Sequence, residues 1–513
     1  MDNFQETELK LSLLESEVSA KLENTLKSLK HLKTPMEESL LESVYYDTAN
    51  HALLAAGWTY RIRKEGDKWT ATVKGMGNSD GGLHQREEWN VTLDDPQPLI
   101  ETFAVPEIQQ TLMDVVKSKP LKPLMETKFT RKKGIWEDGE GNSIEVALDV
   151  GRIEAGGSSV PIHELELELE EGKTAALLDI GKTISDKHPM KPEKNSKFFR
   201  GLLLAGLANE NSPSKSKVKS FPKLNQADAP EGFIHSTAAA MKRLINSLDN
   251  LTEDPDEPEH LHQLRVSIRN LRSVLFLFKP LMEEEQHSKL NKMLREWSRE
   301  TNELRELDMM WQHLQEWIAE LENPAKANKI IDEVKYTRED KRRILKQEIA
   351  EGKMTPKLLD AWCMMERMPE SIADINKKIP VDLFVENRLK KQMKRFNELA
   401  KKINFRNREE LHQLRIRGKK IRYGIENTGM KTSGINTKKS GRILKVSKKL
   451  QDLLGDIHDC HCEMNWMRLI TSGKTQTLDE INLIGQYEGW QLKRIHYLEE
   501  KLEKFWEEYE KKL

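Results

Sequence analysis

The chain of 513 residues has few cysteines and no long apolar run. Its three cysteines, Cys363, Cys460 and Cys462, all lie beyond the first 200 residues, which excludes a disulfide framework there and favours a reducing compartment. No apolar run approaches the roughly 18 residues that a membrane span needs. The N-terminus also lacks the basic and then apolar segments of a secretory signal peptide. We therefore expect a cytoplasmic protein without a membrane span.

Charged residues are abundant, and their signs are unevenly distributed. They make up 33% of the chain, whose formal net charge is −1. Residues 1–200 contain 26 Lys and Arg against 35 Asp and Glu, whereas the remainder contains 57 against 49. A chain of this length is expected to form two to four domains. An acidic half joined to a basic half indicates two different tasks.

The first 205 residues alternate apolar and polar side chains in short segments, which is the period of β-strands. Gly and Asp mark turns between these segments. The expected strands are 4–14, 41–47, 58–64, 69–74, 85–93, 125–133, 143–150, 152–155 and 164–170. The expected helices are 16–32, 96–117 and 174–187. About eight meandering antiparallel strands with flanking helices predict an α+β fold with a closed β-barrel.

Two of these strands carry carboxylates on one face. Glu6, Glu8 and Lys10 share a face because side chains alternate along a strand. In 163–170, four glutamates occupy one face and leucines the other. Such a strand suits a wet barrel interior and a dry outer shell. The alternative is an amphipathic strand on an open sheet with one solvated face.

Other strands place cations on one face: Arg61, Arg63, Lys74, Arg86, Arg131 and Lys133. In a closed barrel these cations would converge with the carboxylates in one tunnel. Guanidinium and ammonium groups neutralise phosphate oxygens, and carboxylate clusters bind Mg²⁺ or Mn²⁺. The pattern therefore predicts a polyphosphorylated ligand held together with a divalent metal ion.

The segment Glu-Thr-Glu-Leu-Lys at 6–10 resembles the ExExK signature of the CYTH superfamily, the triphosphate tunnel metalloenzymes. Further segments resemble blocks of this family in the family's order: 45–48, 61–63, 82–88, 144–151, 164–168 and 196–201. The resemblance covers about residues 1–205. It implies an eight-stranded antiparallel tunnel that acts on triphosphate groups with a divalent metal. Inorganic triphosphatases, thiamine triphosphatases and class IV adenylyl cyclases belong to this superfamily.

The resemblance also implies roles for individual residues. Glu6 and Glu8 become metal ligands and, with Lys10, catalytic residues. Glu164, Glu166 and Glu168 are further candidate ligands, and the sequence leaves open which of them binds metal. The implied substrate contacts are Lys10, Arg61, Arg63, Lys74, Arg86, Arg131, Lys133 and Arg200.

The function implied for this half is hydrolysis of inorganic triphosphate to pyrophosphate and phosphate with Mg²⁺ or Mn²⁺. Three alternatives stay open. The tunnel could serve a polyphosphate-binding scaffold with weak catalysis, act on thiamine or nucleoside triphosphates, or cyclise ATP like class IV adenylyl cyclases.

The second half has helical periodicity and an internal duplication. A segment rich in Ser, Pro, Asn and Lys at 209–230 is typical of a linker. His-Gln-Leu-Arg-Val at 262–266 recurs as His-Gln-Leu-Arg-Ile at 412–416. Each copy begins a row of basic side chains whose spacing places them on one face of a helix. The first row is His262, Arg265, Arg269 and Arg272, and the second is His412, Arg415, Lys419 and Arg422. We call these rows the two stripes. Two repeated helical bundles with a polyanion groove are expected.

The pattern HxLRVxxRxLR resembles the CHAD domain, an all-helical module of two such halves that often follows a CYTH domain. This resemblance covers about residues 225–513 and implies that the eight stripe residues bind inorganic polyphosphate. Nucleic acid fits less well as the polyanion, because no aromatic residues interleave with the stripes for base stacking. The expected domains are 1–206 (CYTH), 207–228 (linker) and 229–513 (CHAD, with repeats at about 229–375 and 380–513). Polyphosphate granules are one expected place of association, and the oligomeric state stays open.

The stretch 456–462, Asp-Ile-His-Asp-Cys-His-Cys, contains possible metal ligands. Its spacing is not that of a structural zinc site. We therefore expect a structural role at the end of a helix.

Overall fold

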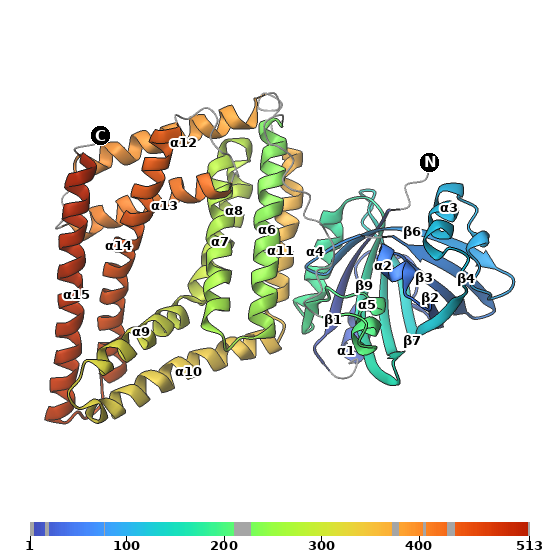
Figure 1. Cartoon of the computed structure of the whole chain (residues 1–513), viewed down its shortest axis with the longest axis horizontal. Coiled ribbons are helices and arrows are strands. Elements are labelled where there is room, and N and C mark those ends of the chain that lie inside the picture. Colours follow the sequence, from blue (N-terminus) through green and yellow to red (C-terminus); the bar gives the residue numbers. More distant parts are fainter. Residues whose placement is uncertain are drawn as a thin grey trace. The chain divides into compact units, whose positions relative to one another are not determined.

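The computed structural model describes residues 5–15, 20–75, 77–209, 227–371, 379–403, 407–427 and 437–510. The chain forms two compact units (Figure 1). The N-terminal unit spans residues 1–220 together with 348–366, and the C-terminal unit spans 221–347 together with 367–513. In the part of the chain that the structure describes, no helix is long and apolar enough to cross a membrane.

Eight antiparallel strands of the N-terminal unit close into a barrel, as the sequence predicts. Their order around the barrel is β1-β9-β8-β7-β2-β3-β4-β6, and β6 pairs with β1 to close it. The bounds are β1 Gln5–Leu13, β2 Glu37–Thr48, β3 Thr59–Glu65, β4 Lys68–Lys74, β6 Leu83–Leu93, β7 Leu121–Glu137, β8 Ser143–Ala155 and β9 Ser158–Glu171. Two short strands extend the sheet, β5 (Asn78–Asp80) beside β6 and β10 (Met190–Pro192) beside β1.

Several expected elements differ from the observed ones in their bounds. The expected helix 16–32, for example, is Ala20–Lys27 in the described part of the chain, and residues 16–19 lie outside that part. The expected strands 143–150 and 152–155 are one strand, β8, which passes through Gly151. A Cβ atom at position 151 would lie 2.2 Å from the Lys128 carbonyl oxygen on β7, so glycine allows a close backbone approach here. The expected helix 96–117 consists of a 3-10 turn, Ile100–Thr102, and the helix α3, Pro106–Val116.

The outer face of the barrel is apolar and covered by helices. Besides α3, this unit contains α1 (Ala20–Lys27), α2 (Ala52–Ala56), α4 (Thr174–Ser185) and α5 (Lys197–Leu204). The outward leucines of β1 and β9, which include Leu9 and Leu167, are fully buried, and α4 packs over both strands. The charged faces of the same strands therefore point into the barrel.

One further helix of the N-terminal unit comes from the second half of the sequence. This helix, α11 (Met354–Arg367), lies beside α4 (Figure 1). Its Cys363 Sγ donates to the carbonyl oxygen of Ala175 on α4 at 3.3 Å. Its Leu358 and Leu359 are fully buried. The barrel is thus covered in part by a segment more than 140 residues beyond its last strand.

The C-terminal unit is all-helical where it is described, in agreement with the prediction. Its helices are α6 Ala229–Glu253, α7 Pro258–Phe278, α8 Glu284–Glu300, α9 Asn302–Ala319, α10 Asn328–Ala350, α12 Val381–Ala400, α13 Arg408–Asn427, α14 Thr437–Thr471 and α15 Leu478–Glu510. Asp228 begins α6 with a capping box to Glu231. The helices α7 and α13, which carry the two copies of the duplicated motif, pack against each other.

Candidate functional site

The barrel encloses a charged cavity of about 110 Å³. Ten of the residues expected at the tunnel site line it: Glu6, Glu8, Lys10, Arg61, Arg63, Lys74, Arg86, Arg131, Glu166 and Glu168. They come from β1, β3, β4, β6, β7 and β9. Closure of the sheet therefore brings together residues that lie up to about 160 positions apart in the sequence.

Glu166 is at the centre of a buried ion network. It accepts hydrogen bonds from Lys10, Arg131 and Lys197, the last with Nζ 2.7 Å from Oε1. Lys197 on α5 also reaches Asp149 at 2.8 Å and Glu164 at 2.9 Å. Burial raises the pKa of the Glu166 carboxyl, but attraction by Lys10, Lys197 and Arg131 outweighs it and holds this pKa well below its ordinary range. Glu166 is therefore a compensated carboxylate.

Glu168, two residues further along β9 on the same face, is in a different environment. It lies opposite Glu8 in the β1–β9 register. Burial, followed by repulsion from Glu6 and Glu8, raises the pKa of Glu168 to about 8. Burial also raises the pKa of Glu6 to about 7, although Lys74 opposes the shift from 2.7 Å. The cations at this end of the cavity thus do not offset the burial of Glu6 and Glu168.

Positive charge is in excess around Arg63 of β3. Burial lowers the pKa of its neighbour Arg61, but Tyr45 and Glu88 outweigh it and the net shift is upward. The Nε atoms of Arg61 and Arg63 are buried, and within the described residues neither has a hydrogen-bond acceptor. Burial, then repulsion from Arg61 and Arg131, lowers the pKa of Arg63 to about 10. Burial raises the pKa of the nearby Tyr45 phenol, but Arg61 and Arg63 outweigh it and the net shift is downward. Buried cations without enough counter-charge form a site for an anion.

Three of the expected site residues lie outside the cavity lining. Glu164 is fully buried and binds Lys197 and Arg200. Lys133 has a 41% exposed side chain and pairs with Glu145 at 2.9 Å. Arg200 is on α5 and bonds to Glu164.

Several residues that line the cavity were not among the expected site residues. They are Tyr45, Thr59, Thr72, Glu88, Ser196, Lys197 and Phe198. Strand alternation could have identified Thr72 and Glu88, since they are in phase with Lys74 and Arg86. Lys197 points into the barrel because of the way α5 packs on β7, β8 and β9. Strand periodicity does not predict this packing.

In the C-terminal unit, the two cationic stripes lie on the packed helices α7 and α13. Burial, followed by repulsion from Arg415 and Arg269, lowers the pKa of Lys419 to about 7. Burial and Arg269 lower the pKa of Arg265 to about 10. The Nε atoms of Arg269 and Arg415 are buried, with no acceptor among the residues described. We call Arg265, Arg269, Arg415 and Lys419 the cation cluster.

The ends of the stripes are tied to neighbouring side chains. Arg272 Nε donates to Asn291 Oδ1 at 3.0 Å, and Arg422 Nη1 donates to Gln451 Oε1 at 3.4 Å. Arg265 is tied as well, since its guanidinium donates to Thr301 Oγ1 at 3.0 Å and to Asn302 Oδ1 at 2.8 Å. Among the described stripe residues, the buried Nε atoms without an acceptor are those of Arg269 and Arg415.

Family models match the two parts of the chain separately. The CYTH domain model matches residues 5–202, and the CHAD domain model matches residues 237–468. The chain contains a CYTH domain at 5–202, followed by a CHAD domain at 237–468. Both resemblances noted in the sequence are thereby confirmed.

An inorganic triphosphatase of Haemophilus influenzae is 32% identical to the chain over 209 residues. These residues make up 40% of the chain and 56% of the Haemophilus protein, so the match spans little more than half of that relative.

Two solved structures resemble the chain more distantly. The CHAD domain from the plant Ricinus communis covers 55% of the chain and 93% of its own length, at 17% identity and a TM-score of 0.45. A putative adenylyl cyclase from Hippeastrum, described as having a dominant triphosphatase activity, covers 41% and 99%, at 22% identity and a TM-score of 0.28. At these scores neither likeness bears on the activity of the chain.

The carboxylates of the CYTH domain fit a hard divalent cation. Within the described part of the chain, no three His, Cys, Asp or Glu side chains are placed to hold a metal ion. Lys10 instead contacts Glu8 at 2.8 Å, and Lys74 contacts Glu6 and Glu88 at 2.7 Å. Glu6, Glu8 and Glu168 are carboxylate oxygen donors, the donor type that Mg²⁺ and Mn²⁺ prefer. Burial raises the pKa of Glu8, but Lys10 outweighs it and the net shift lowers this pKa to about 2.

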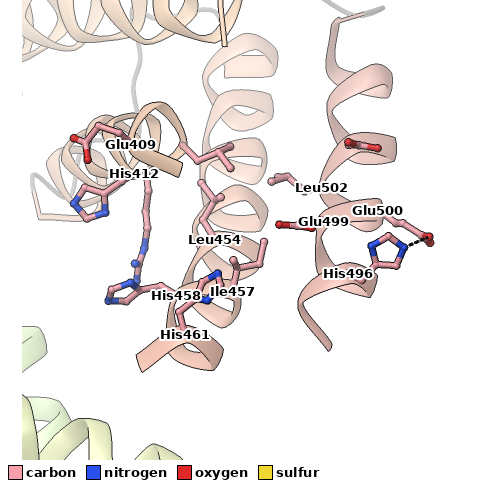
Figure 2. A pocket seen from close by; sticks show the side chains of 13 residues that line it. Glu409, His412, Leu454, Ile457, His458, His461, His496, Glu499, Glu500 and Leu502 are labelled. Carbon is pink, nitrogen blue, oxygen red and sulfur yellow. Dashed lines mark ion pairs between the residues drawn. The ribbon is translucent and has the colours of Figure 1, made fainter. Parts of the chain in front are cut away.

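The CHAD domain contains a second cavity, of about 670 Å³, between α13, α14 and α15 (Figure 2). Figure 2 shows His412, His458 and His461 toward one side and Glu499 and Glu500 of α15 toward the other. Arg415 lines this cavity too, so the cavity borders the cation cluster.

The stretch 456–462 lies inside α14, and the expected position at a helix end is wrong. The helix continues through this stretch because Cys460 and Met464 belong to a buried apolar cluster formed by α12, α13, α14 and α15. Burial raises the pKa of the Cys460 thiol to about 12.

Proposed function

We propose that the CYTH domain hydrolyses inorganic triphosphate to pyrophosphate and phosphate. The observation that carries this proposal is the polarity of the cavity. Arg63 contributes poorly compensated positive charge, and Glu6 and Glu168 are carboxyl groups with raised pKa values in the same small space. A phosphate chain bridged to a divalent cation satisfies both at once.

The residues of the tunnel would act chiefly by binding and charge stabilisation. The guanidinium groups of Arg61, Arg63 and Arg131 hold phosphate oxygens and stabilise the charge that spreads over the transferred phosphoryl group. Glu6, Glu8 and Glu168 would hold Mg²⁺ or Mn²⁺, which supplies charge neutralisation and an acidified water. Because the cavity is largely enclosed by protein, these interactions act in a low-dielectric environment and are stronger than in water.

The size of the cavity favours an inorganic substrate. Its volume of about 110 Å³ is well below the roughly 300–1,000 Å³ of sites for drug-sized organic ligands. Tyr45 and Phe198, which stack at 5.3 Å, are the aromatic side chains among its described lining residues. A bare phosphate chain therefore suits the tunnel better than thiamine triphosphate or ATP, and the same argument disfavours an adenylyl cyclase.

Phosphate release tests this function. The full chain would be assayed with tripolyphosphate, ATP, thiamine triphosphate and long-chain polyphosphate, each with Mg²⁺ and with Mn²⁺. The expected result is a kcat/KM for tripolyphosphate at least about tenfold above that for the organic triphosphates, which differ from it by a bulky group that the cavity does not hold. Equal or faster turnover of ATP or thiamine triphosphate would overturn the substrate assignment. Absence of turnover with every compound would favour the scaffold alternative.

We propose further that the cation cluster of the CHAD domain binds inorganic polyphosphate. Arg265 and Arg269 on α7 and Arg415 and Lys419 on α13 surround one region. Burial lowers the pKa of Arg265, Arg415 and Lys419, and the buried Nε atoms of Arg269 and Arg415 have no acceptor among the described residues. A linear polyanion can contact both helices along their stripes. His262 lies about one helical turn before Arg265, and His412 lies about one turn before Arg415. The two histidines therefore extend the same two stripes.

The affinity for polyphosphate is expected to depend on the protonation of Lys419. Its pKa of about 7 lies below the ordinary value, so the group becomes charged as the pH falls from 9 to 6. Arg415, Arg269, Arg265, Asp459 and His458 surround it, and burial lowers the pKa of His458 as well. One additional ion pair with phosphate corresponds to about a tenfold lower dissociation constant at pH 6 than at pH 9.

Fluorescence titration with long-chain polyphosphate at constant salt measures this dependence. Lys419→Arg keeps its charge throughout and is expected to flatten the profile between pH 7 and 9. Lys493→Arg, an exposed lysine on α15, is the matched control and should retain the profile of the parent. A flat parent profile, or displacement of polyphosphate by duplex DNA at equal phosphate concentration, would contradict the proposal.

A further inference from the structure

The strand that carries Glu6, Glu8 and Lys10 is backed by two layers of helix. Leu9, between Glu8 and Lys10, points away from the cavity and is fully buried. Gly181 of α4 lies directly over it, because a Cβ atom at Gly181 would be 2.6 Å from Leu9 Cδ2. The same Cβ atom would be 3.3 Å from Leu359 Cδ1 of α11. Leu9, Gly181 and Leu359 thus form one continuous line of contact from β1 to α11.

A second contact joins α11 to the neighbour of β1. The Thr355 hydroxyl donates to the carbonyl oxygen of Met190 at 2.6 Å. Met190 begins β10, which pairs with β1 through Leu13↔Met190 and Leu11↔Pro192. Gly352, in the turn before α11, has φ +68°, and a Cβ atom there would be 2.7 Å from the Met190 nitrogen. The turn therefore also lies closely against β10.

The inner face of β1 provides a reason for this backing. Glu6, Glu8 and Glu168 line the same small cavity, and Glu8 lies directly opposite Glu168 in the β1–β9 register, so carboxylates face one another across these strands and repel. Repulsion on one face of a strand favours outward displacement of that strand. Apolar packing on the other face opposes it, since burial of Leu9 against α4 and of Leu359 against α4 removes apolar area from water.

We propose that α11 is a positioning element of the tunnel, which sets the place of β1 through Leu359 on α4 and Thr355 on β10. The expected effect of α11 on catalysis rests on the function proposed for the tunnel, whereas its expected effect on the position of β1 does not. The metal-binding carboxylates of β1 then depend on a helix that comes from within the helical half of the sequence. Leu359 and Thr355 touch neither substrate nor metal, so they act through β1.

The test uses the full chain with Leu359→Ala and, as a matched control, Leu112→Ala. Leu112 is a fully buried leucine of α3 in the cluster around Tyr60, and α3 is not packed on β1. Three properties would be measured: hydrogen exchange of the backbone amides of residues 5–13, the dissociation constant for Mn²⁺, and kcat and KM for tripolyphosphate. A thermal unfolding scan shows that both variants are folded and how far each is destabilised.

Leu359→Ala is expected to speed exchange in residues 5–13 about tenfold or more and to weaken Mn²⁺ binding about 10–100-fold, the range seen when supporting groups of a metal site are lost. It should lower kcat more than it raises KM, since phosphate contacts from β3 and β7 are unchanged. Leu112→Ala should leave exchange in residues 5–13 and Mn²⁺ binding unchanged at an equal loss of unfolding temperature. Leu359→Met is expected to restore exchange and Mn²⁺ binding to near the parent values.

Two further variants keep the result decisive. Leu359→Val removes less volume and serves if Leu359→Ala does not fold. Gly181→Ala places a methyl group against Leu9 and should also weaken Mn²⁺ binding. The double variant Gly181→Ala with Leu359→Ala gives α4 room to move away from β1, so it should recover part of the lost Mn²⁺ affinity. Unchanged exchange in residues 5–13 in a folded Leu359 variant would overturn the proposal. Absence of hydrolysis in the parent would overturn the tunnel function alone, because exchange and Mn²⁺ binding still report on β1.

Discussion

The Glu168→Gln variant is expected to lose metal-dependent phosphate release by roughly 1,000-fold in kcat/KM, because a metal ligand supports several kcal/mol of transition-state stabilisation. Its Mn²⁺ affinity should fall in parallel. The reason is the group of carboxylates at this end of the cavity, where burial and repulsion from Glu6 and Glu8 raise the pKa of Glu168 to about 8. Phosphate release and Mn²⁺ titration measure the two effects.

Two other glutamates of β9 serve as comparisons. Glu170→Gln changes an exposed carboxylate on the same strand, outside the cavity, and should keep the activity of the parent. Glu166→Gln should instead lower the free energy of unfolding by about 3–5 kcal/mol, because it leaves Lys10, Arg131 and Lys197 short of a buried partner. Equal instability of the Glu166 and Glu168 variants, or tight Mn²⁺ binding in Glu168→Gln, would contradict this division of roles.

Arg63→Ala is expected to reduce kcat/KM for tripolyphosphate by about 1,000-fold, within the range of about 10³–10⁵ for arginines that stabilise phosphoryl transfer. The guanidinium is buried, its Nε has no acceptor in the described part of the chain, and burial with Arg61 and Arg131 lowers its pKa to about 10. It can therefore form new hydrogen bonds to a bound substrate. Steady-state kinetics with tripolyphosphate measure the loss.

Stability distinguishes this role from a structural one. Without substrate, Arg63→Ala should unfold at the same temperature as the parent or higher, since a poorly compensated buried charge is removed. Arg63→Lys should recover only part of the activity, because an ammonium lacks the bidentate fork. Arg152→Ala, which removes a 57% exposed arginine on β8, is the control that keeps activity. A loss below tenfold in Arg63→Ala, or a large drop in unfolding temperature, would contradict the assignment.

Strand alternation was sufficient to predict the barrel and its charged interior. Arg61 and Arg63 on β3 share the face of Glu6 and Glu8 on β1 once the sheet closes, and period two alone determines which side chains turn inward. Strand alternation could not tell which of Glu164, Glu166 and Glu168 binds metal, because all three side chains lie on the same face of the strand. Their difference arises from Lys10, Arg131 and Lys197, which approach from three separate elements.

Other features depend on contacts that local sequence does not encode. Gly151 interrupts the strand pattern of 143–155, yet in the barrel it permits β7 to approach β8 closely. The helix α11 has ordinary amphipathic periodicity, which does not reveal that its partner is α4 of the barrel. In both cases a segment that is distant in the sequence determines the structural role of these residues.

The pairing of β1 also determines the order in which the protein can mature during synthesis. The strand β1 needs β6 and β9 as partners and β10 as a third, and its backing is complete only when α11, at 354–367, has been made. At translation rates of about 5–20 residues per second, this interval is on the order of tens of seconds. For that time the nascent chain exposes the apolar surface of α4, a segment on which chaperones that recognise apolar chains would act.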